Sequence, residues 1–297
     1  ERMLYLRGVI SNSVGLAGLI FISLTRDGVG LHAALALGVQ WLVFAVHGMP
    51  FRSETFYDLS GSLTHLLVVV SVLVREQMVR SPRQLLCAVG SIVWTTRLGT
   101  FLYARILRDG KDERFDTIKK TWISFLGAWT IQAVWVTLIQ LPVILVNLVN
   151  DSSIPTSGID LLCLIVWIAA FLIEAVADTQ KTAFRNDPAN KSRYITSGLW
   201  AHSRHPNYFG EILMWLAMAT SVSAAGIQLG DYTMLFSYLS PVFTAFLLLV
   251  VSGVPMVEKA GLKKWGDEPQ YRHYIEKTSM VVPWRAAPPF TATTEMH

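Results

Sequence analysis

The stretch Ser203–Glu211, with the sequence SRHPNYFGE, opens an apolar run that continues to residue 228. A guanidinium, an imidazole, an amide, a phenol and a carboxylate therefore meet where the chain would enter a bilayer. Placing so many polar groups at a membrane boundary is costly unless they bind something polar. The run predicts a membrane-spanning helix, and the polar groups at its start predict a cofactor site.

The rest of the chain repeats this apolar pattern. Of its 297 residues, 52% are hydrophobic and 15% are charged, whereas a soluble domain has about 25% charged residues. Because about 20 apolar residues cross a hydrocarbon core of about 30 Å, we predict an all-α polytopic membrane bundle of about seven or eight helices, with ten as the upper limit. The predicted spans are 8–24, 32–49, 59–74, 84–107, 121–149, 158–177, 208–228 and 232–255.

The basic residues indicate how these spans are oriented. Most of the 25 Lys and Arg residues fall in the N-terminus, the even-numbered loops and the tail, which the positive-inside rule places in the cytosol. The net charge of +4 is therefore explained by topology and lipid headgroups, and we expect no nucleic-acid partner. We predict a monomeric integral membrane protein of a bacterial inner membrane or the endoplasmic reticulum. Two isolated cysteines in apolar spans, Cys87 and Cys163, predict neither a disulfide framework nor a metal site.

The chain has one membrane domain with two functional halves. Residues 1–150 are aromatic and apolar, whereas residues 151–285 hold the longest polar loop, and the Pro/Thr-rich segment 286–297 is predicted to be disordered. Span 121–149 is too long to cross upright, so it must tilt or extend along the interface. Its Gln132 needs a hydrogen-bond partner, either on another helix or in a substrate cavity.

The polar segment 108–116 alternates charges densely. It is either a solvated turn or a basic rim over a phosphate-rich cofactor. Arg105, Arg108 and Lys111 share helical spacing, so a continued helix would present all three on one face.

Chemistry-bearing residues gather in one loop and its two flanking helices. Glu174 and Asp178 are four residues apart and so share a helical face, as do Glu211 and Trp215. Carboxylates suit ribose or amide hydrogens, and Arg suits phosphates. Singly, these residues are equally consistent with interface anchors, a helix start or packing pairs. The full set is Glu174, Asp178, Arg185, Arg193, Tyr194, Arg204, His205, Asn207, Tyr208 and Glu211.

These motifs resemble a known family. Residues 204–211, with Asp178 and Arg185 upstream and the ending Tyr271, Tyr274 and 281–284, are similar to the C-terminal domain of steroid 5-alpha reductases and their uncharacterised bacterial relatives. The sterol C14 and C7 reductases share a similar motif. In the N-terminal half, residues 56–63 and 108–116 resemble the uncharacterised branch.

The resemblance implies a membrane reductase that holds NADPH among its C-terminal helices, in a cavity open to the cytosol. The C-terminal half would be the cofactor side, and the N-terminal half the substrate side. The implied cofactor-binding residues are Lys111, Asp178, Arg185, Arg193, Tyr194, Arg204, His205, Asn207, Tyr208, Glu211, Glu258 and Tyr271.

For a lipophilic, steroid-like enone, the resemblance implies donors that hydrogen-bond the substrate carbonyl while hydride reaches the β-carbon. Tyr57 and Asp58 occupy a similar place to the family's Gln-Glu pair, Glu54 lies one turn before, and Tyr103 is a candidate for its later Tyr. These four are the predicted catalytic residues. The predicted substrate-binding residues are Trp94, Trp129, Gln132 and Trp215.

Two other functions remain open. Isoprenylcysteine and phospholipid methyltransferases carry a related Arg-His-Pro motif and a Glu-Glu pair that binds S-adenosylmethionine, whereas Glu258-Lys259 supplies one carboxylate here. The second alternative is a sterol- or lipid-binding membrane protein without turnover.

Overall fold

The computed structural model describes residues 2–74, 80–112, 115–149, 154 and 156–290. Across these residues the chain is helical and contains no strand. Within this described part of the chain, eight segments are long and apolar enough to cross a membrane, which confirms the predicted all-α polytopic fold. They are Arg2–Ser23, Val29–Phe51, Tyr57–Val74, Pro82–Arg108, Trp122–Ile139, Gly158–Asn186, Pro206–Leu229 and Tyr232–Trp265.

The chain divides into two compact units. Unit 1 comprises Glu1–Asp160 and Ala219–Ser240, and unit 2 comprises Leu161–Met218 and Pro241–His297. Unit 1 thus contains the N-terminal helices together with residues 219–240 from later in the chain. Of the tail predicted at 286–297, residues 291–297 lie outside the described residues.

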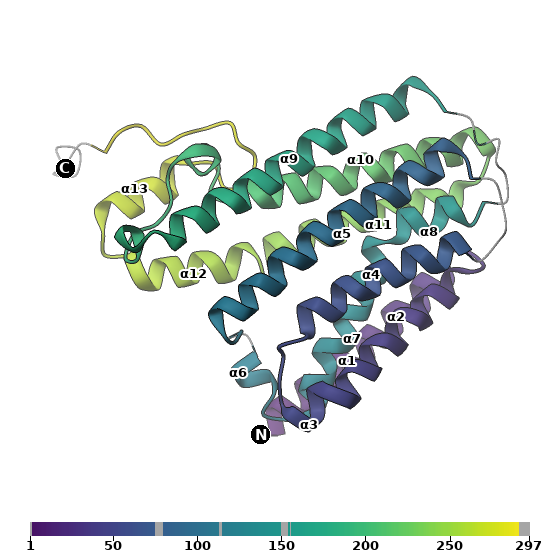
Figure 1. Cartoon of the computed structure of the whole chain (residues 1–297), viewed down its shortest axis with the longest axis horizontal. Helices are drawn as coiled ribbons and strands as arrows, with labels where there is room; N and C mark the ends of the chain where they lie inside the picture. Colours follow the sequence, from purple (N-terminus) through teal and green to yellow (C-terminus); the bar gives the residue numbers. More distant parts are fainter. Residues whose placement is uncertain (1, 75–79, 113–114, 150–153, 155, 291–297) are drawn as a thin grey trace. The chain divides into compact units, whose positions relative to one another are not determined.

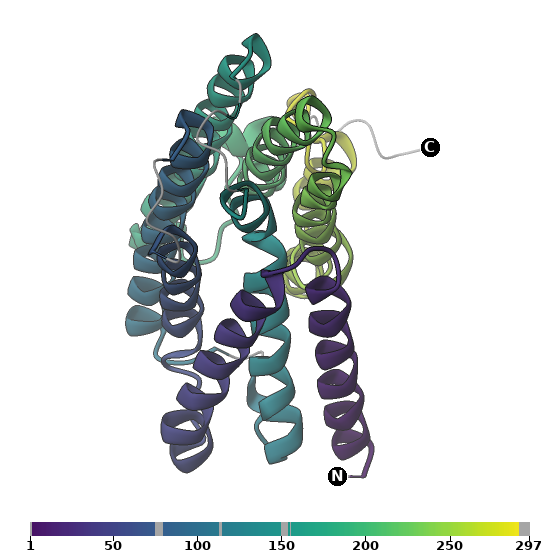
Figure 2. The same cartoon turned by 90° about the vertical axis from the view of Figure 1, so that its right-hand side faces the viewer.

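Unit 1 contains both parallel and antiparallel helix pairs. Helix α1 (Arg2–Ser23) packs along α7 (Trp122–Ile139), and α2 (Val29–Val43) packs on both α7 and α4 (Tyr57–Val74), as Figures 1 and 2 show. Helices α1 and α7 run parallel, since Gly8 of one lies against Ser124 of the other and Gly15 against Thr130. Helix α5 (Pro82–Asp109) packs on α4. It begins with a capping box in which Ser81 and Gln84 exchange side-chain and backbone hydrogen bonds. Short helices α3 (Met49–Phe51) and α6 (Phe115–Ile118) complete the end of this unit at which α7 starts.

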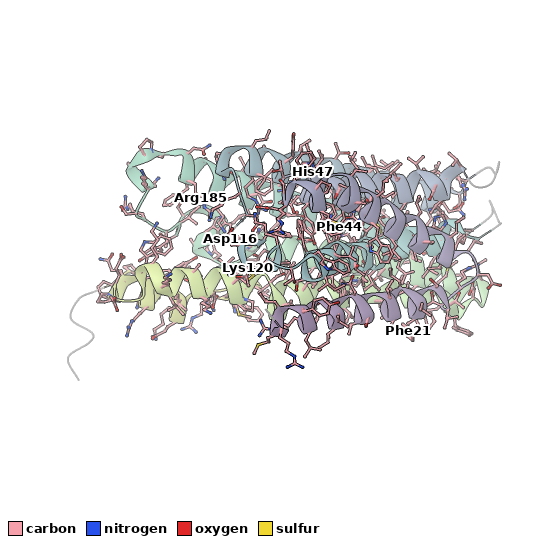
Figure 3. The ribbon with its side chains drawn as sticks, turned by 90° about the horizontal axis from the view of Figure 1, so that it is seen from below. Phe21, Phe44, His47, Asp116, Lys120 and Arg185 are labelled. Carbon is pink, nitrogen blue, oxygen red and sulfur yellow. The ribbon has the colours of Figure 1, made fainter. Side chains whose placement is uncertain are left out.

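Aromatic rings fill the core near this end of unit 1. The turn η1 (Phe44–Gly48) is a π-helical segment between α2 and α3, and it carries Phe44 and His47 (Figure 3). Phe44 contacts Phe125 edge-on, with ring centroids 5.6 Å apart. Phe115 and the fully buried Trp129 belong to the same cluster.

The fifth predicted span is broken into two helices. α7 ends at Ile139, Gln140 follows it, and α8 (Leu141–Asn147) begins with Pro142 in its first turn. Proline lacks an N–H and so cannot continue the helical ladder from the preceding turn. All residues of α8 are buried. Of the two predicted alternatives, tilting or extending along the interface, the second is therefore wrong, because the extra length forms a buried second helix.

The predicted continuation of α5 to Lys111 is also wrong. The helix ends at Asp109, and Gly110 caps it with a left-handed φ of 77°. Lys111 lies beyond the cap and pairs with Asp116 over 3.1 Å. Arg105, still on the helix, pairs with Asp58 over 3.1 Å. The two cations thus form separate ion pairs rather than one basic face.

A buried ion pair holds the other end of unit 1. Arg83 Nη2 lies 2.6 Å from Asp160 Oδ2, and Arg83 Nε donates to Oδ1 over 2.8 Å. Ser221 donates to the same carboxylate over 2.6 Å. The Arg83 side chain is 1% exposed, so this fully hydrogen-bonded arrangement compensates for burying two charges.

Unit 2 contains most of α9 (Gly158–Asn186), the first half of α10 (Pro206–Leu229), and α12 (Val254–Trp265) and α13 (Pro269–Lys277). Two short 3-10 turns, Pro188–Asn190 and Gly198–Ala201, lie in the loop between α9 and α10. The remaining elements are η4 (Tyr232–Tyr238), α11 (Leu239–Phe246) and the π-helical η5 (Leu247–Val251), of which η4 belongs to unit 1.

Candidate functional site

A close approach of two helices positions the candidate site in unit 2. Gly210 of α10 lies against α9, and a Cβ at this position would lie 2.6 Å from the Ala170 carbonyl oxygen and 2.8 Å from the Glu174 nitrogen. Only glycine allows this approach without displacing backbone. It faces the α9 segment that carries Glu174 and Asp178, which are 2% and 6% exposed.

The first turn of α10 binds the acidic face of α9. Asn207 Nδ2 donates to Asp178 Oδ1 over 3.1 Å. The buried Asn207 Oδ1 has no hydrogen-bond partner within the described residues. One buried amide oxygen is thus available here to accept a hydrogen bond from a ligand.

Glu258 of α12 pairs with both basic residues before α10. Its Oε1 lies 2.6 Å from Arg204 Nη1 and 3.2 Å from His205 Nε2. The His205 ring also stacks on Tyr208, with centroids 5.0 Å apart and planes 2° apart. Burial lowers the pKa of His205, although the Glu258 carboxylate opposes that shift.

The segment after α13 is hydrogen-bonded to the loop that precedes α10. Arg204 N donates to the Ser279 carbonyl over 2.9 Å. Ser203 Oγ donates to the Val281 carbonyl over 2.6 Å and accepts from His205 N over 3.1 Å. The side chain of Ser203 therefore ties the start of α10 to the C-terminal segment.

The loop between α9 and α10 is fixed by α9 itself. Gly198 adopts a φ of 62°, which favours glycine, and Leu199 N donates to Gln180 Oε1 over 3.0 Å. Trp200 Nε1 donates to the Ala177 carbonyl over 2.9 Å. Lys181 Nζ lies 4.5 Å from the centroid of the Trp200 ring, a cation–π distance.

Aromatic side chains cluster near Glu258. Tyr194 contacts Tyr271, with centroids 4.7 Å apart, and Trp265, with centroids 5.6 Å apart. Tyr274 donates to the Trp200 carbonyl over 2.8 Å. Burial raises the pKa of Tyr194, Tyr271 and Tyr274, so all three are neutral hydrogen-bonding groups at ordinary pH.

The other predicted cofactor residues of unit 2 differ in exposure. Arg185, near the end of α9 (Figure 3), and Arg193 are exposed. Glu211 is partly buried on α10, and Trp215 one turn later is 1% exposed. Every predicted cofactor residue except Lys111 thus belongs to unit 2, and Lys111 belongs to unit 1.

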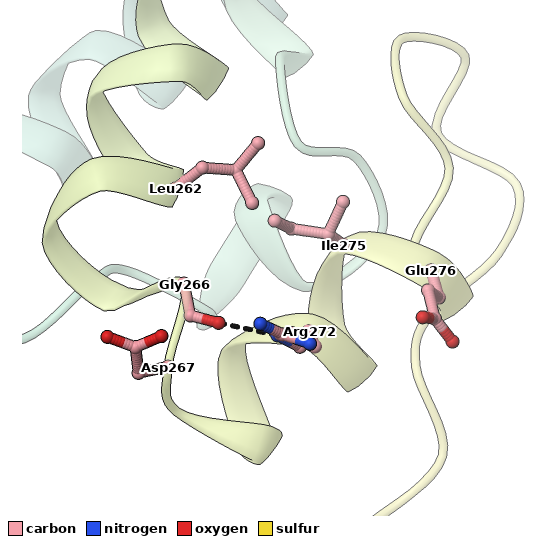
Figure 4. Close-up of a pocket in the computed structure, with 6 residues that line it drawn as sticks. All are labelled: Leu262, Gly266, Asp267, Arg272, Ile275 and Glu276. Carbon is pink, nitrogen blue, oxygen red and sulfur yellow. Dashed lines mark hydrogen bonds between the residues drawn. The ribbon is translucent and has the colours of Figure 1, made fainter.

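A surface cavity of about 450 Å³ lies one turn beyond Glu258, between α12 and α13 (Figure 4). Arg272 reaches across it and donates to the Gly266 carbonyl. Leu262, Asp267, Ile275 and Glu276 complete its lining. None of the predicted site residues lines it, and its charges are mixed. The chemistry of the Arg204–His205 loop is therefore the stronger guide to a site.

The predicted catalytic residues lie in unit 1, where three of them make protein contacts. Tyr57 donates to the Ala128 carbonyl over 3.0 Å. Asp58 pairs with Arg105, and Glu54 pairs with Lys119 over 2.7 Å. Tyr103 is partly buried on α5.

The predicted substrate residues of unit 1 are buried. Trp94 and Trp129 are both fully buried. Gln132 donates to the Tyr57 carbonyl over 2.8 Å. This contact supports the interhelical reading of Gln132, although its Oε1 has no partner in the described part of the chain.

The residue types gathered in unit 2 are chemically suited to a phosphate-bearing dinucleotide. Cations suit phosphates, while Asp178 and Asn207 suit ribose hydroxyls or a carboxamide. The buried Arg204 Nε, Thr278 Oγ1 and Ser279 Oγ, like Asn207 Oδ1, lack partners among the residues that the structure describes. Buried polar atoms are normally hydrogen-bonded, so these four are open to a ligand.

Three residues that contact this loop are absent from the predicted site: Lys181, Gln180 and Trp200. Gln180 and Trp200 hold the loop around Gly198, whose φ is left-handed. The Ser203 link needs the C-terminal segment, which sequence spacing does not bring near.

No curated protein and no solved structure gives a significant match to the chain. A family profile matches residues 43–278, which is most of the chain and includes both the Asp58 region and the site in unit 2. The protein therefore belongs to the family described as "Protein of unknown function (DUF1295)".

Proposed function

We propose that this protein is an integral membrane reductase that uses NADPH to reduce a carbon–carbon double bond conjugated to a carbonyl in a lipophilic, steroid-like substrate. The observation that carries the proposal is the meeting of Asp178, Arg204, His205, Asn207 and Glu258 around the start of α10. The family's association with steroid 5-alpha reductase-like proteins supports it. The protein acts as a monomer whose basic, cofactor-binding end faces the cytosol.

The cations of unit 2 bind the phosphates in this proposal. Arg185 and Arg193 are exposed, so they attract the anionic end of the cofactor from water. Arg204 is held by Glu258 and offers its Nε. The positive end of the α10 dipole adds to this attraction.

Asp178, Asn207 and Glu211 bind the uncharged polar groups. Asp178 accepts a hydrogen bond from Asn207 Nδ2, which leaves Asn207 Oδ1 to accept one from the ligand. Trp215, one turn beyond Glu211, closes the apolar end and excludes water. When bound, NADPH supplies the hydride for the β-carbon of the enone.

Unit 1 supplies the substrate side. A hydrogen-bond donor at the carbonyl stabilises the negative charge that develops on its oxygen. Tyr57 donates to the Ala128 carbonyl, so it must exchange that contact to donate to the substrate. Asp58 and Glu54 pair with cations, so each must exchange that contact and also carry a proton before it can donate.

One observation favours a second candidate function. Glu258 contacts the Arg204-His205 pair, and the methyltransferases that share the Arg-His-Pro motif use late carboxylates to bind S-adenosylmethionine. In this alternative the protein transfers a methyl group to a lipid.

Isothermal titration of the purified chain with NADPH and with S-adenosylmethionine separates the two candidates. We expect NADPH to bind and S-adenosylmethionine not to bind. NADPH oxidation that depends on an enone steroid such as progesterone then separates a reductase from a lipid-binding protein. Binding of S-adenosylmethionine alone would overturn the reductase proposal.

A further inference from the structure

His65 lies deep in unit 1, in the middle of helix α4. It follows Tyr57 by eight residues, which places it about 12 Å along the helix from its start. Its side chain is buried, with 1% exposure. An imidazole at this depth of an apolar span is costly and needs a reason.

Two buried residues fix the orientation and tautomer of this imidazole. Ser91 Oγ donates to Gln140 Oε1 over 2.7 Å, and Gln140 Nε2 lies 2.9 Å from His65 Nδ1. An amide nitrogen can only donate, so Nδ1 accepts and the ring proton resides on Nε2. Ser91 and Gln140 are both 0% exposed, so water does not compete for these bonds.

The Nε2–H group is left as an unused donor. It has no hydrogen-bond partner among the described residues, and neither has the buried hydroxyl of Thr95 on the neighbouring helix α5. Gln140 lies at the break after α7, and from this position its side chain orients the His65 ring.

Two indoles stand perpendicular to the His65 ring. The centroid distances are 5.3 Å to Trp94 and 4.6 Å to Trp135, with interplanar angles of 89° and 90°. Trp94 is fully buried and Trp135 is partly exposed, so His65 lies one ring away from the surface of unit 1. The surroundings are aromatic and apolar, with one oriented donor.

We propose that His65 Nε2–H donates the hydrogen bond to the carbonyl oxygen of a flat, lipophilic ligand that lies against Trp94 and Trp135. The inference rests on the proposed function in taking that ligand to be the enone substrate. A neutral, preoriented donor shielded from water stabilises developing charge on a carbonyl oxygen. It also needs no exchange of an existing protein contact, unlike Tyr57, Asp58 and Glu54.

The test uses the full chain in lipid nanodiscs and progesterone carrying carbon-13 at its enone carbonyl. Infrared difference spectra report the carbonyl stretch, which a hydrogen bond moves to lower wavenumber. In the wild type we expect this shift. His65→Asn keeps an acceptor for Gln140 but removes the Nε2 donor, so the band returns toward its position in apolar solvent and affinity falls about 10-fold.

Two further variants separate the hydrogen bond from packing. His65→Gln carries an amide N–H near the place of Nε2 and restores part of the shift. His32→Asn is the matched control, because His32 is equally buried on α2 and contacts Ser71 through Nδ1 over 2.9 Å. It leaves the carbonyl band unchanged.

An unshifted band in the wild type overturns the proposal without any variant. So does a band that stays shifted in His65→Asn while progesterone remains bound, and so does a wild type that binds no progesterone. NADPH titration of the same samples tells these failures apart from failure of the cofactor assignment, because all variants are expected to bind NADPH normally.

Discussion

Asn207 donates a hydrogen bond to Asp178 over 3.1 Å, and this contact joins the first turn of α10 to the acidic face of α9. The amide satisfies a buried carboxylate and at the same time leaves its own oxygen without a partner in the described residues. The pair therefore has a structural role, and in the proposed function it also has a binding role.

Replacing Asn207 by alanine removes both of these roles. Hydrogen bonds to charged groups contribute about 1.5–3 kcal/mol, so we expect the NADPH dissociation constant to rise roughly 10- to 100-fold. Calorimetric titration measures the change. Asn190→Ala is the control, because Asn190 donates to Asp187 in an exposed turn of the same unit. Unchanged NADPH affinity in Asn207→Ala would remove this residue from the site.

His205 makes the stability of unit 2 depend on pH. Burial lowers its pKa in the folded protein below the ordinary value of 6.5, with Lys181 and Arg204 acting in the same direction and Glu258 opposing. The unfolded chain therefore binds the proton more readily. This contribution to stability is fully present above pH 6.5 and is lost as pH falls from 6.5 through the lowered pKa.

Thermal unfolding of the purified protein at pH 7.5 and 5.5 tests this dependence. We expect the Tm of the wild type to fall more between these two pH values than the Tm of His205→Gln, because the variant has no titrating side chain at position 205. Equal falls in the two proteins would show that other groups control the response.

Gly210→Ala probes the contact between α9 and α10. The added methyl group would meet the Ala170 carbonyl oxygen at 2.6 Å, and overpacking of this kind destabilises by about 1–3 kcal/mol. We expect a lower Tm together with weaker NADPH binding. Gly38→Ala on α2 is the control, since a Cβ there meets no atom of the described chain within 4 Å, and alanine favours helix. A Gly210→Ala variant as stable as Gly38→Ala would contradict the close approach.

Arg83→Met leaves the Asp160 carboxylate buried without its guanidinium. Breaking a buried pair on one side costs about 3–5 kcal/mol, so a large fall in Tm is expected. Asp160→Leu combined with Arg83→Met removes both charges and should recover much of the loss. If the double variant is no more stable than Arg83→Met, the pair is not the source of the effect.

The sequence was sufficient for the helices and for the helical face that Glu174 and Asp178 share. Apolar runs near 20 residues predict membrane spans directly, and the i, i+4 spacing of Glu174 and Asp178 places both on one face because α9 is a continuous helix. It failed where one residue stops a helix. Gly110 turns left-handed before Lys111, and the chain breaks at Gln140 before Pro142.

The remaining site residues depend on contacts between distant segments. Glu258 meets His205 across 53 positions of the chain, and His65 meets Gln140 across 75. A single histidine in an apolar run gives no sequence signal of its partner, because that partner lies on a helix whose packing no local pattern specifies.

The C-terminal segment that binds Ser203 and Arg204 is synthesised after helices α9, α10, α12 and α13. The loop before α10 therefore stays without its backbone acceptors at Ser279 and Val281 until nearly all helices have been made. In the proposed function, the cofactor site is therefore completed only after these helices have been synthesised, and a truncation before residue 281 should insert into the membrane but bind NADPH weakly.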